Sequence, residues 1–194
     1  MQLSEHFTLE ELTHTDHREL DNTPTEHEKC IVDGKEEIIN AAANLPRLAA
    51  FLEEIKKVLG GKPIMVNSAF RSEAVNTAVG SKNTSDHRRG CAADIRVPGM
   101  TPDEVVKAII ASDLPYQQVI REFDRWTHVS MVTHVGDIPK KSKLIIDKTG
   151  TRPYARCQPP LMGKCCHAFT EASIPPRCQP RKHDPCKRGR LVRV

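Results

Sequence analysis

Apolar residues recur at helical spacing in one long stretch of the chain. Steps of three and four residues join Leu45, Leu48, Leu52, Ile55 and Leu59, and the pair of glycines at 60–61 then ends the pattern. This spacing places the five side chains on one face of a helix. We therefore predict a long amphipathic helix that ends near residue 60 and buries its apolar face in the core.

Shorter helices are indicated by their first residues. Thr8 and Thr101 each precede a glutamate by three residues, which is the spacing of a capping box, where the two side chains bond free backbone N–H groups of the first turn. Ser72 is a further helix-capping residue, and Gly80 follows at the position where helices commonly end. The sequence therefore predicts short helices that begin directly after residues 8, 72 and 101.

Short apolar runs predict the strands, and they cluster late in the chain. They lie at 64–66, 91–97, 118–120, 126–132 and 144–146. Residues 13–35 are polar and irregular, so no regular element is expected there. Because helices come early and short strands come late, we expect an α+β fold with a small, mainly antiparallel sheet flanked by helices. The pattern leaves the order of the strands open.

Composition narrows the class of protein. The chain has 194 residues, of which 38% are hydrophobic and 4% aromatic, so it is long enough for one domain with an appendage and its core must be aliphatic. Its longest apolar runs fall far short of the roughly 20 residues that a membrane span needs. The first residues also lack the basic start and apolar stretch of a secretory signal. We expect no membrane span and a cytoplasmic location.

The last 38 residues differ from the rest in composition. They contain eight Lys or Arg against two acids, five of the seven cysteines and six of the fourteen prolines. With few large apolar side chains they cannot bury a core, so we expect residues 155–194 to be a disordered basic tail. The repeat of Arg156-Cys157-Gln158-Pro159 at 177–180 leaves an alternative open, a small metal-bound or disulfide-linked module that binds anionic cell-wall polymer.

Three residues have the chemistry of a metal site. His87 lies in a predicted loop, and Gly90 lets the chain turn into the strand that carries Asp94. A buried carboxylate without a partner costs several kcal/mol, so Asp94 needs a cation or hydrogen bonds. In the strand at 126–132, alternation places Val129 on the apolar face and His128 on the other. Two histidines, one aspartate and an open fourth position are what a catalytic zinc requires.

These residues lie in segments that resemble a known family. SAFRSEAVN at 68–76, SDHRRGCAADI at 85–95 and EFDRWTHVSM at 122–131 resemble the zinc D-alanyl-D-alanine carboxypeptidases and peptidoglycan endopeptidases of bacteria and many phage endolysins. The family pattern is Ser-x-His-x-x-Gly-x-Ala-x-Asp followed later by Trp-x-His. FTLEEL near the start and DNTP at 21–24 resemble the phage-type members. The resemblance covers residues 1–154 and implies a zinc peptidase domain of the hedgehog and D-Ala-D-Ala peptidase type.

Carried over residue by residue, the resemblance implies a set of roles. The cofactor is Zn²⁺, and its ligands are His87, Asp94 and His128. The substrate-facing wall includes Arg71, Ser85 and Trp126. The guanidinium of Arg71 suits an oxyanion or a substrate carboxylate, because its fork can bond two oxygens.

The catalytic base is left between two residues. Many relatives carry an acid three positions before the last histidine, where this chain has Arg125. Glu122 and Asp124 lie six and four residues before His128. We favour Glu122, because Glu-Phe-x-Arg-Trp-x-His resembles the phage-type subgroup and the related hedgehog domain also has a glutamate six residues before its last ligand. The base would take a proton from water and pass it to the leaving amine.

The resemblance implies a metallopeptidase that hydrolyses peptide bonds in peptidoglycan stem peptides, as a carboxypeptidase or an endopeptidase. A phage or prophage endolysin that stays in the host cytoplasm until lysis is the expected role, and a monomer the expected state. The alternative is a non-enzymatic zinc domain that binds the cell wall or a protein. Specific nucleic-acid binding is not expected, because it would rest on the charge of the tail alone.

Overall fold

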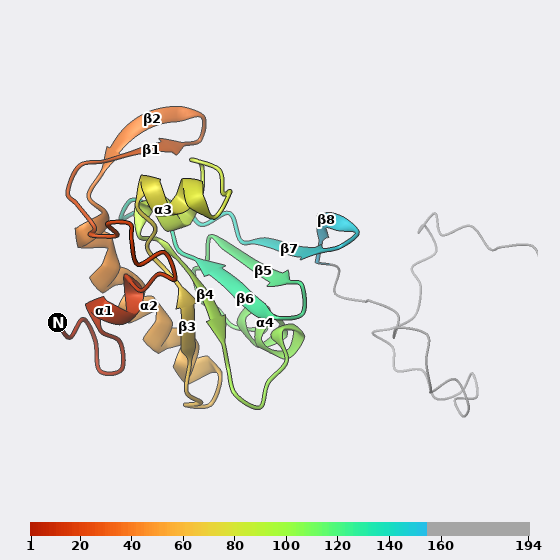
Figure 1. Cartoon of the computed structure of the whole chain (residues 1–194). Helices are drawn as coiled ribbons and strands as arrows, with labels where there is room; N and C mark the ends of the chain where they lie inside the picture. The colour runs from red at the N-terminus through yellow and green to blue at the C-terminus, as the bar shows by residue number, and fades with distance from the viewer. Residues whose placement is uncertain (155–194) are drawn as a thin grey trace, which may run out of the picture. The chain divides into compact units, whose positions relative to one another are not determined.

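A six-stranded mixed sheet forms the centre of the fold (Figure 1). Its spatial order is β3-β4-β6-β5-β7-β8, and all neighbours are antiparallel except the parallel pair β5 and β7. The strands are β3 (Met65–Ser68), β4 (Ala92–Arg96), β5 (Gln118–Glu122), β6 (Trp126–Ser130), β7 (Ser142–Asp147) and β8 (Gly150–Pro153). The expected α+β class with a mainly antiparallel sheet is confirmed. The strand β8 was not predicted.

The helices begin where their capping residues indicate. They are α1 (Leu9–Leu12), α2 (Ala41–Val58), α3 (Glu73–Ala78), α4 (Pro102–Ala111) and the 3₁₀ helix η1 (Asp86–Arg89). Both predicted capping boxes form, at Thr8 and at Thr101, and Ser72 caps α3. The long helix starts four residues before its leucine stripe, because Asn40 caps it. Local hydrogen bonding therefore sets where these helices begin.

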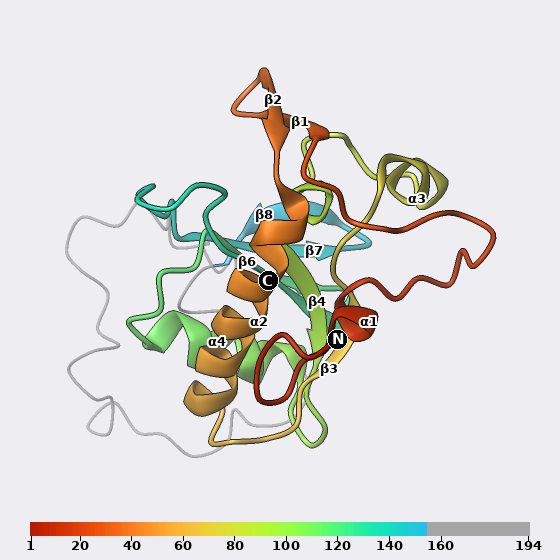
Figure 2. The same cartoon turned by 90° about the vertical axis from the view of Figure 1, so that its left-hand side faces the viewer.

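One face of the sheet is covered and carries the core. Helices α2 and α4 contact each other and lie against this face (Figure 2). Their buried side chains pack on inward residues of the strands, among them Leu45, Leu52, Val106, Ile109, Val119, Val129 and Ile145. Since side chains alternate along a strand, the other face is left for polar residues. That face carries the site described below.

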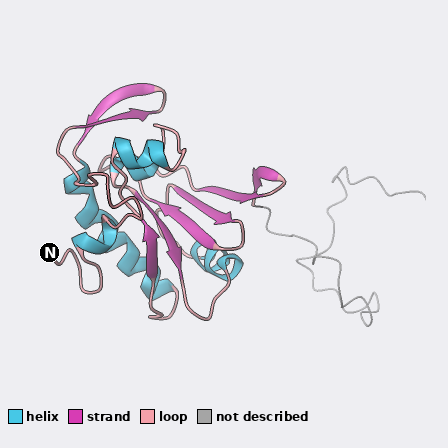
Figure 3. Ribbon diagram, in the orientation of Figure 1, coloured by secondary structure: helices cyan, strands magenta, loops and turns pink. Residues whose placement is uncertain are grey.

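A separate hairpin corrects the sequence interpretation of residues 13–35. The strands β1 (Glu28–Val32) and β2 (Lys35–Ile39) form a two-stranded sheet that stands apart from the main one (Figure 3). Asp33 and Gly34 at its tip have φ of 46° and 83°, the positive values that a tight turn matching the twist of a hairpin requires. The prediction of an irregular segment was wrong from residue 28 onward, and the Asp-Gly pair was the missed signal.

The structural model is computed and describes residues 1–154, which form one compact unit. The predictions for the tail at 155–194 lie outside the described residues. Among the helices of the described part, none is long and apolar enough to cross a membrane.

Candidate metal centre

His87, Asp94 and His128 converge at the middle of the polar face of the sheet. Asp94 is the third residue of β4 and pairs in register with His128, the third residue of β6. His87 comes from η1, directly before the turn into β4. All three side chains are buried. Among residues 1–154, this is the group of His, Cys, Asp or Glu side chains that could hold a metal ion.

The ligand atoms form a compact triangle. Nε2 of His87 lies 3.2 Å from Nδ1 of His128 and 3.3 Å from Oδ1 of Asp94. Nδ1 of His128 lies 2.9 Å from the same Oδ1. Ligands placed 2.0 to 2.1 Å from a tetrahedral zinc are about 3.3 Å from one another. The triangle is therefore close to the size of one face of a zinc tetrahedron, and the three residues fit such an ion.

The hydrogen bond of His87 fixes which nitrogen faces the cluster. Nδ1 lies 2.6 Å from the carbonyl oxygen of Ala69. Because a carbonyl can only accept, Nδ1 carries the proton and Nε2 keeps a lone pair in the neutral ring. Burial lowers the pKa of His87, despite the opposing effect of Asp94. The ring is thus held neutral and oriented, as a metal ligand requires.

Asp94 is held as a carboxylate. Burial alone would raise its pKa, but the neighbouring imidazoles of His87 and His128 outweigh that effect and hold the pKa of Asp94 well below its ordinary value. Its Oδ1 faces the imidazoles, while Oδ2 accepts a hydrogen bond of 2.7 Å from Nη2 of Arg71. Nε of Arg71 donates to Oγ of Ser68. Arg71 lines the cleft, and its bond to Oδ2 orients the carboxylate of Asp94.

The loop that presents His87 depends on two small residues. Oγ of Ser85 accepts the backbone N–H of His87 and caps η1. Gly90 ends η1 with φ of 65°, and a Cβ at this position would lie 2.9 Å from the carbonyl oxygen of Ala41 in α2. Glycine is therefore required both by the left-handed backbone and by the close approach of the helix.

Glu122 lies in the same cleft as the triangle. It is the last residue of β5 and pairs in register with Trp126 of β6, whose Nε1 donates a 2.8 Å hydrogen bond to its Oε2. Burial raises the pKa of Glu122, and the neighbouring charge of Asp94 adds to the effect. Its Oε1 has no hydrogen-bond partner within residues 1–154. Trp126 lines the cleft and orients this carboxylate through its indole N–H.

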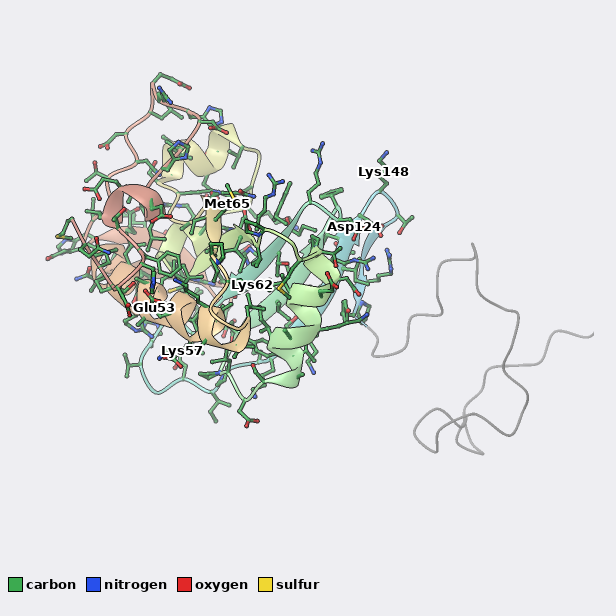
Figure 4. All side chains as sticks on the ribbon, turned by 90° about the horizontal axis from the view of Figure 1, so that it is seen from below. Glu53, Lys57, Lys62, Met65, Asp124 and Lys148 are labelled. Atoms are coloured by element: carbon green, nitrogen blue, oxygen red, sulfur yellow. The ribbon has the colours of Figure 1, made fainter. Side chains whose placement is uncertain are left out.

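Asp124, the other candidate base, lies elsewhere. It sits in the turn between β5 and β6 with φ of 53°, and 67% of its side chain is exposed. Its carboxylate forms an ion pair of 3.1 Å with Nε of Arg121. Figure 4 shows Asp124 at the margin of the domain, on the side of the β7–β8 hairpin that carries Lys148. The cleft around the triangle is lined by Glu122 but not by Asp124.

The cleft has a volume of about 910 Å³ and extends beyond the residues named from the sequence. One wall comes from the β1–β2 hairpin through Ile31 and Asp33, and part of the floor comes from Gln118 and Ser142. The Asp33-Gly34 pair, which is typical of a hairpin turn, could have indicated the hairpin that forms this wall. Gln118 could have been found from strand alternation, because it lies on the same face of β5 as Glu122.

Other histidines of the described part, and the cysteine next to the turn into β4, lie outside the triangle. His14 is exposed, His17 is partly exposed, and His134 pairs with Glu37 at the surface. Cys91 is fully buried, its Sγ donates to the carbonyl oxygen of Arg89, and burial raises the pKa of the thiol to about 11. It is a core side chain.

Comparison with known proteins adds one match. A family model described as Peptidase M15 matches residues 5–130, a stretch that holds the triangle, Glu122 and Trp126. No curated protein matches the chain.

Proposed function

Because the chain belongs to the Peptidase M15 family, we propose that it is a zinc-dependent peptidase that hydrolyses peptide bonds in bacterial peptidoglycan. The observation that carries the proposal is the triangle of His87, Asp94 and His128 donor atoms in one cleft with the carboxylate of Glu122. In this proposal the three residues are the zinc ligands and Glu122 is the base. Arg71 orients Asp94, and Ser85 and Trp126 border the substrate.

In this proposal the metal ion and the carboxylate of Glu122 have different roles in the hydrolysis. A zinc ion held by the three ligands supplies a Lewis acid, which polarises a carbonyl and makes water more acidic. Oε1 of Glu122 would accept a proton from the attacking water and deliver it to the leaving amine nitrogen as the C–N bond breaks. The raised pKa of Glu122 suits this exchange, because such a carboxylate binds and releases a proton more evenly at neutral pH.

The decisive experiment is digestion of purified peptidoglycan followed by mass spectrometry of the fragments. We expect new amino and carboxyl ends at one type of peptide bond. The Glu122→Gln variant should retain zinc and fold while hydrolysis falls by about 100-fold or more, and Asp124→Asn should have little effect. The reverse ranking would move the base to Asp124.

Intact peptidoglycan after treatment with zinc-loaded protein would contradict the proposal. If that protein still bound the wall, the non-enzymatic binding domain would replace it.

We further propose a role in host lysis as a phage or prophage endolysin, supported by the resemblance of FTLEEL and DNTP to phage-type members. Bacteria that express the chain should then lyse quickly when their membrane is permeabilised, and cells expressing His128→Ala should not. Equal lysis of both cultures would contradict this role.

A further inference from the structure

A second hollow lies beside the cleft, on the other side of Trp126. It has a volume of about 690 Å³, and Trp126 lines both spaces. Its other lining residues are His14, Asp16, Val66, Asn67, Arg96, Asp124 and Arg125. None of them belongs to the metal triangle or holds Glu122. The hollow is therefore a separate surface that shares one wall with the site.

Strand register explains why the two spaces adjoin at Trp126. Arg96 lies two residues beyond Asp94 on β4, so both side chains lie on the polar face of the sheet. Asp94 pairs with His128 and Ile95 with Thr127, so the next register position brings Arg96 opposite Trp126. The second hollow thus lies on the same polar face of the sheet as the triangle, two residues further along the strands.

The triangle lies between two stretches of this face. Asp94 and His128 are the middle residues of their five-residue strands. On one side the cleft runs to Gln118, Ser142 and the β1–β2 hairpin, and on the other it runs past Trp126 to Arg96. One five-residue strand spans about 13 Å, at about 3.3 Å per residue. A peptide laid along the strands would therefore have room on both sides of the metal.

The second hollow carries unpaired positive charge. Arg96 and Arg125 are exposed and have no hydrogen-bond or ion-pair partner within the described part of the chain. Of the two acids beside them, Asp124 is paired with Arg121, which leaves Asp16. Two free guanidiniums against one acid favour a carboxylate, which a guanidinium can bond through two oxygens.

The cleft itself lacks a free guanidinium for a terminal carboxylate. Of its lining cations, Arg71 is bonded to Asp94, Arg89 is paired with Asp86 and Lys140 with Asp33, which leaves the ammonium group of Lys82, exposed in the loop before η1. A carboxypeptidase must hold the carboxylate that ends its substrate next to the scissile bond. In this protein the unpaired arginines lie beyond Trp126, further along the face.

We propose that the second hollow binds an acidic segment of the substrate and that the enzyme cuts inside a peptide chain. This inference rests on the peptidase activity proposed above. The scissile bond would lie over the triangle, with several residues of the chain extending to each side and an acidic side chain reaching Arg96 and Arg125.

The mode of cleavage is tested with peptides blocked at both ends. Cross-linked stem peptides carrying an N-terminal acetyl group and C-terminal amides are compared with the same peptides ending in free carboxylates. We expect internal cleavage of both, seen by mass spectrometry. Loss of a terminal residue from the free peptides alone would overturn the inference while leaving the peptidase function intact. If neither these peptides nor whole peptidoglycan were cleaved, the proposed function itself would fail, and the inference with it.

The role of the hollow is tested by removing its charge. In Arg96→Gln/Arg125→Gln, KM for a substrate with an acidic residue should rise about tenfold, while kcat and zinc content stay unchanged. A substrate with glutamine in place of that acid should not distinguish the variant from the unaltered protein. The control Lys57→Gln/Lys148→Gln removes two charges at exposed positions outside both spaces (Figure 4). An unchanged KM in the arginine variant, or an equal rise in the control, would overturn the assignment.

Discussion

One ring nitrogen of His87 and one of His128 are required for the cluster to bind a metal. Their facing nitrogens lie 3.2 Å apart, and both lie near one oxygen of Asp94. Removal of either imidazole leaves two ligands, one fewer than catalytic zinc sites use. We expect His87→Ala and His128→Ala each to lose the metal and the activity together, as measured by elemental analysis and hydrolysis.

A matched control is available for these two variants. His134 is half-exposed and pairs with Glu37 at the surface, so His134→Ala should keep the full metal content. Unchanged metal in both ligand variants would show that the site is wrong.

The indole N–H of Trp126 gives a second prediction at this scale. It donates to Oε2 of Glu122, so Trp126→Phe keeps an aromatic wall but releases the carboxylate. We expect kcat to fall by about 10-fold or more with little change in KM, because misplacing Glu122, the base that we propose, weakens proton transfer rather than binding. A rise in KM at constant kcat, measured by steady-state kinetics, would instead assign Trp126 to substrate binding alone.

The sequence predicted which residues meet at the site better than how each one acts. The motifs indicated His87, Asp94 and His128 as candidate metal ligands. Strand alternation predicted that His128 lies on the polar face of the sheet, where the structure has it. The bond from Trp126 to Glu122 was not predicted, because it joins side chains across two strands whose pairing the pattern left open. Side-chain partners follow from register, and register is a tertiary property.

Among the elements, α4 is bonded to the sheet through the carboxylate of Asp103. Asp103 in the first turn of α4 accepts hydrogen bonds from Arg121 of β5 and from the hydroxyl of Tyr154, and it pairs with Lys107. Burial would raise its pKa, but the bonds from Lys107 and Tyr154 outweigh it and hold the pKa of Asp103 below the ordinary 3.8. This carboxylate therefore stabilises the fold in its ionised form.

We expect Asp103→Asn to lower the free energy of unfolding by about 1 to 3 kcal/mol at pH 7. Because the pKa is lower in the folded protein, the stabilisation is present above the ordinary value of 3.8 and is lost as the pH falls below it. Urea unfolding at pH 7 and near pH 3 should show a difference between variant and unaltered protein that shrinks in acid. Asp113→Asn, at an exposed position, is the control. A difference that is constant with pH would contradict the assignment.

The elements themselves were predictable to different degrees. Helices with a capping residue and strands with β-branched runs were found at nearly the right residues. The β1–β2 hairpin was missed, since the exposed and charged side chains of β2 hide its alternation, and only Asp33-Gly34 indicated the turn. The parallel pairing of β5 with β7 could not be predicted, because it joins strands that are separated by β6 in the sequence.

At the scale of the whole molecule, the residues of the candidate site and the residues of the hydrophobic core lie on opposite faces of one sheet. The helices α2 and α4 bury the apolar face, while the ligands and Glu122 use the polar one. A change to the polar face therefore removes few core contacts. This separation explains why substitutions of His87, His128 and Glu122 should remove metal or activity without unfolding the protein.

The chain after Tyr154 gives the last prediction. The three proposed ligands, Glu122 and the core residues of the described part precede that point. A protein that ends at residue 154 should therefore keep its fold, its zinc and its hydrolysis of soluble muropeptides. The remainder carries the positive excess of the chain, so its removal should weaken binding to whole cell walls, and this difference should shrink at high salt, because ions screen exposed charges.

Two assays on the full and shortened proteins check this prediction, hydrolysis of soluble fragments and pelleting with cell walls at low and high salt. Unfolding or loss of zinc on truncation would show that the cysteine-rich segment belongs to the catalytic domain. Equal pelleting of both proteins would contradict an electrostatic role, because nine Lys or Arg residues cannot be removed from an electrostatic contact without weakening it.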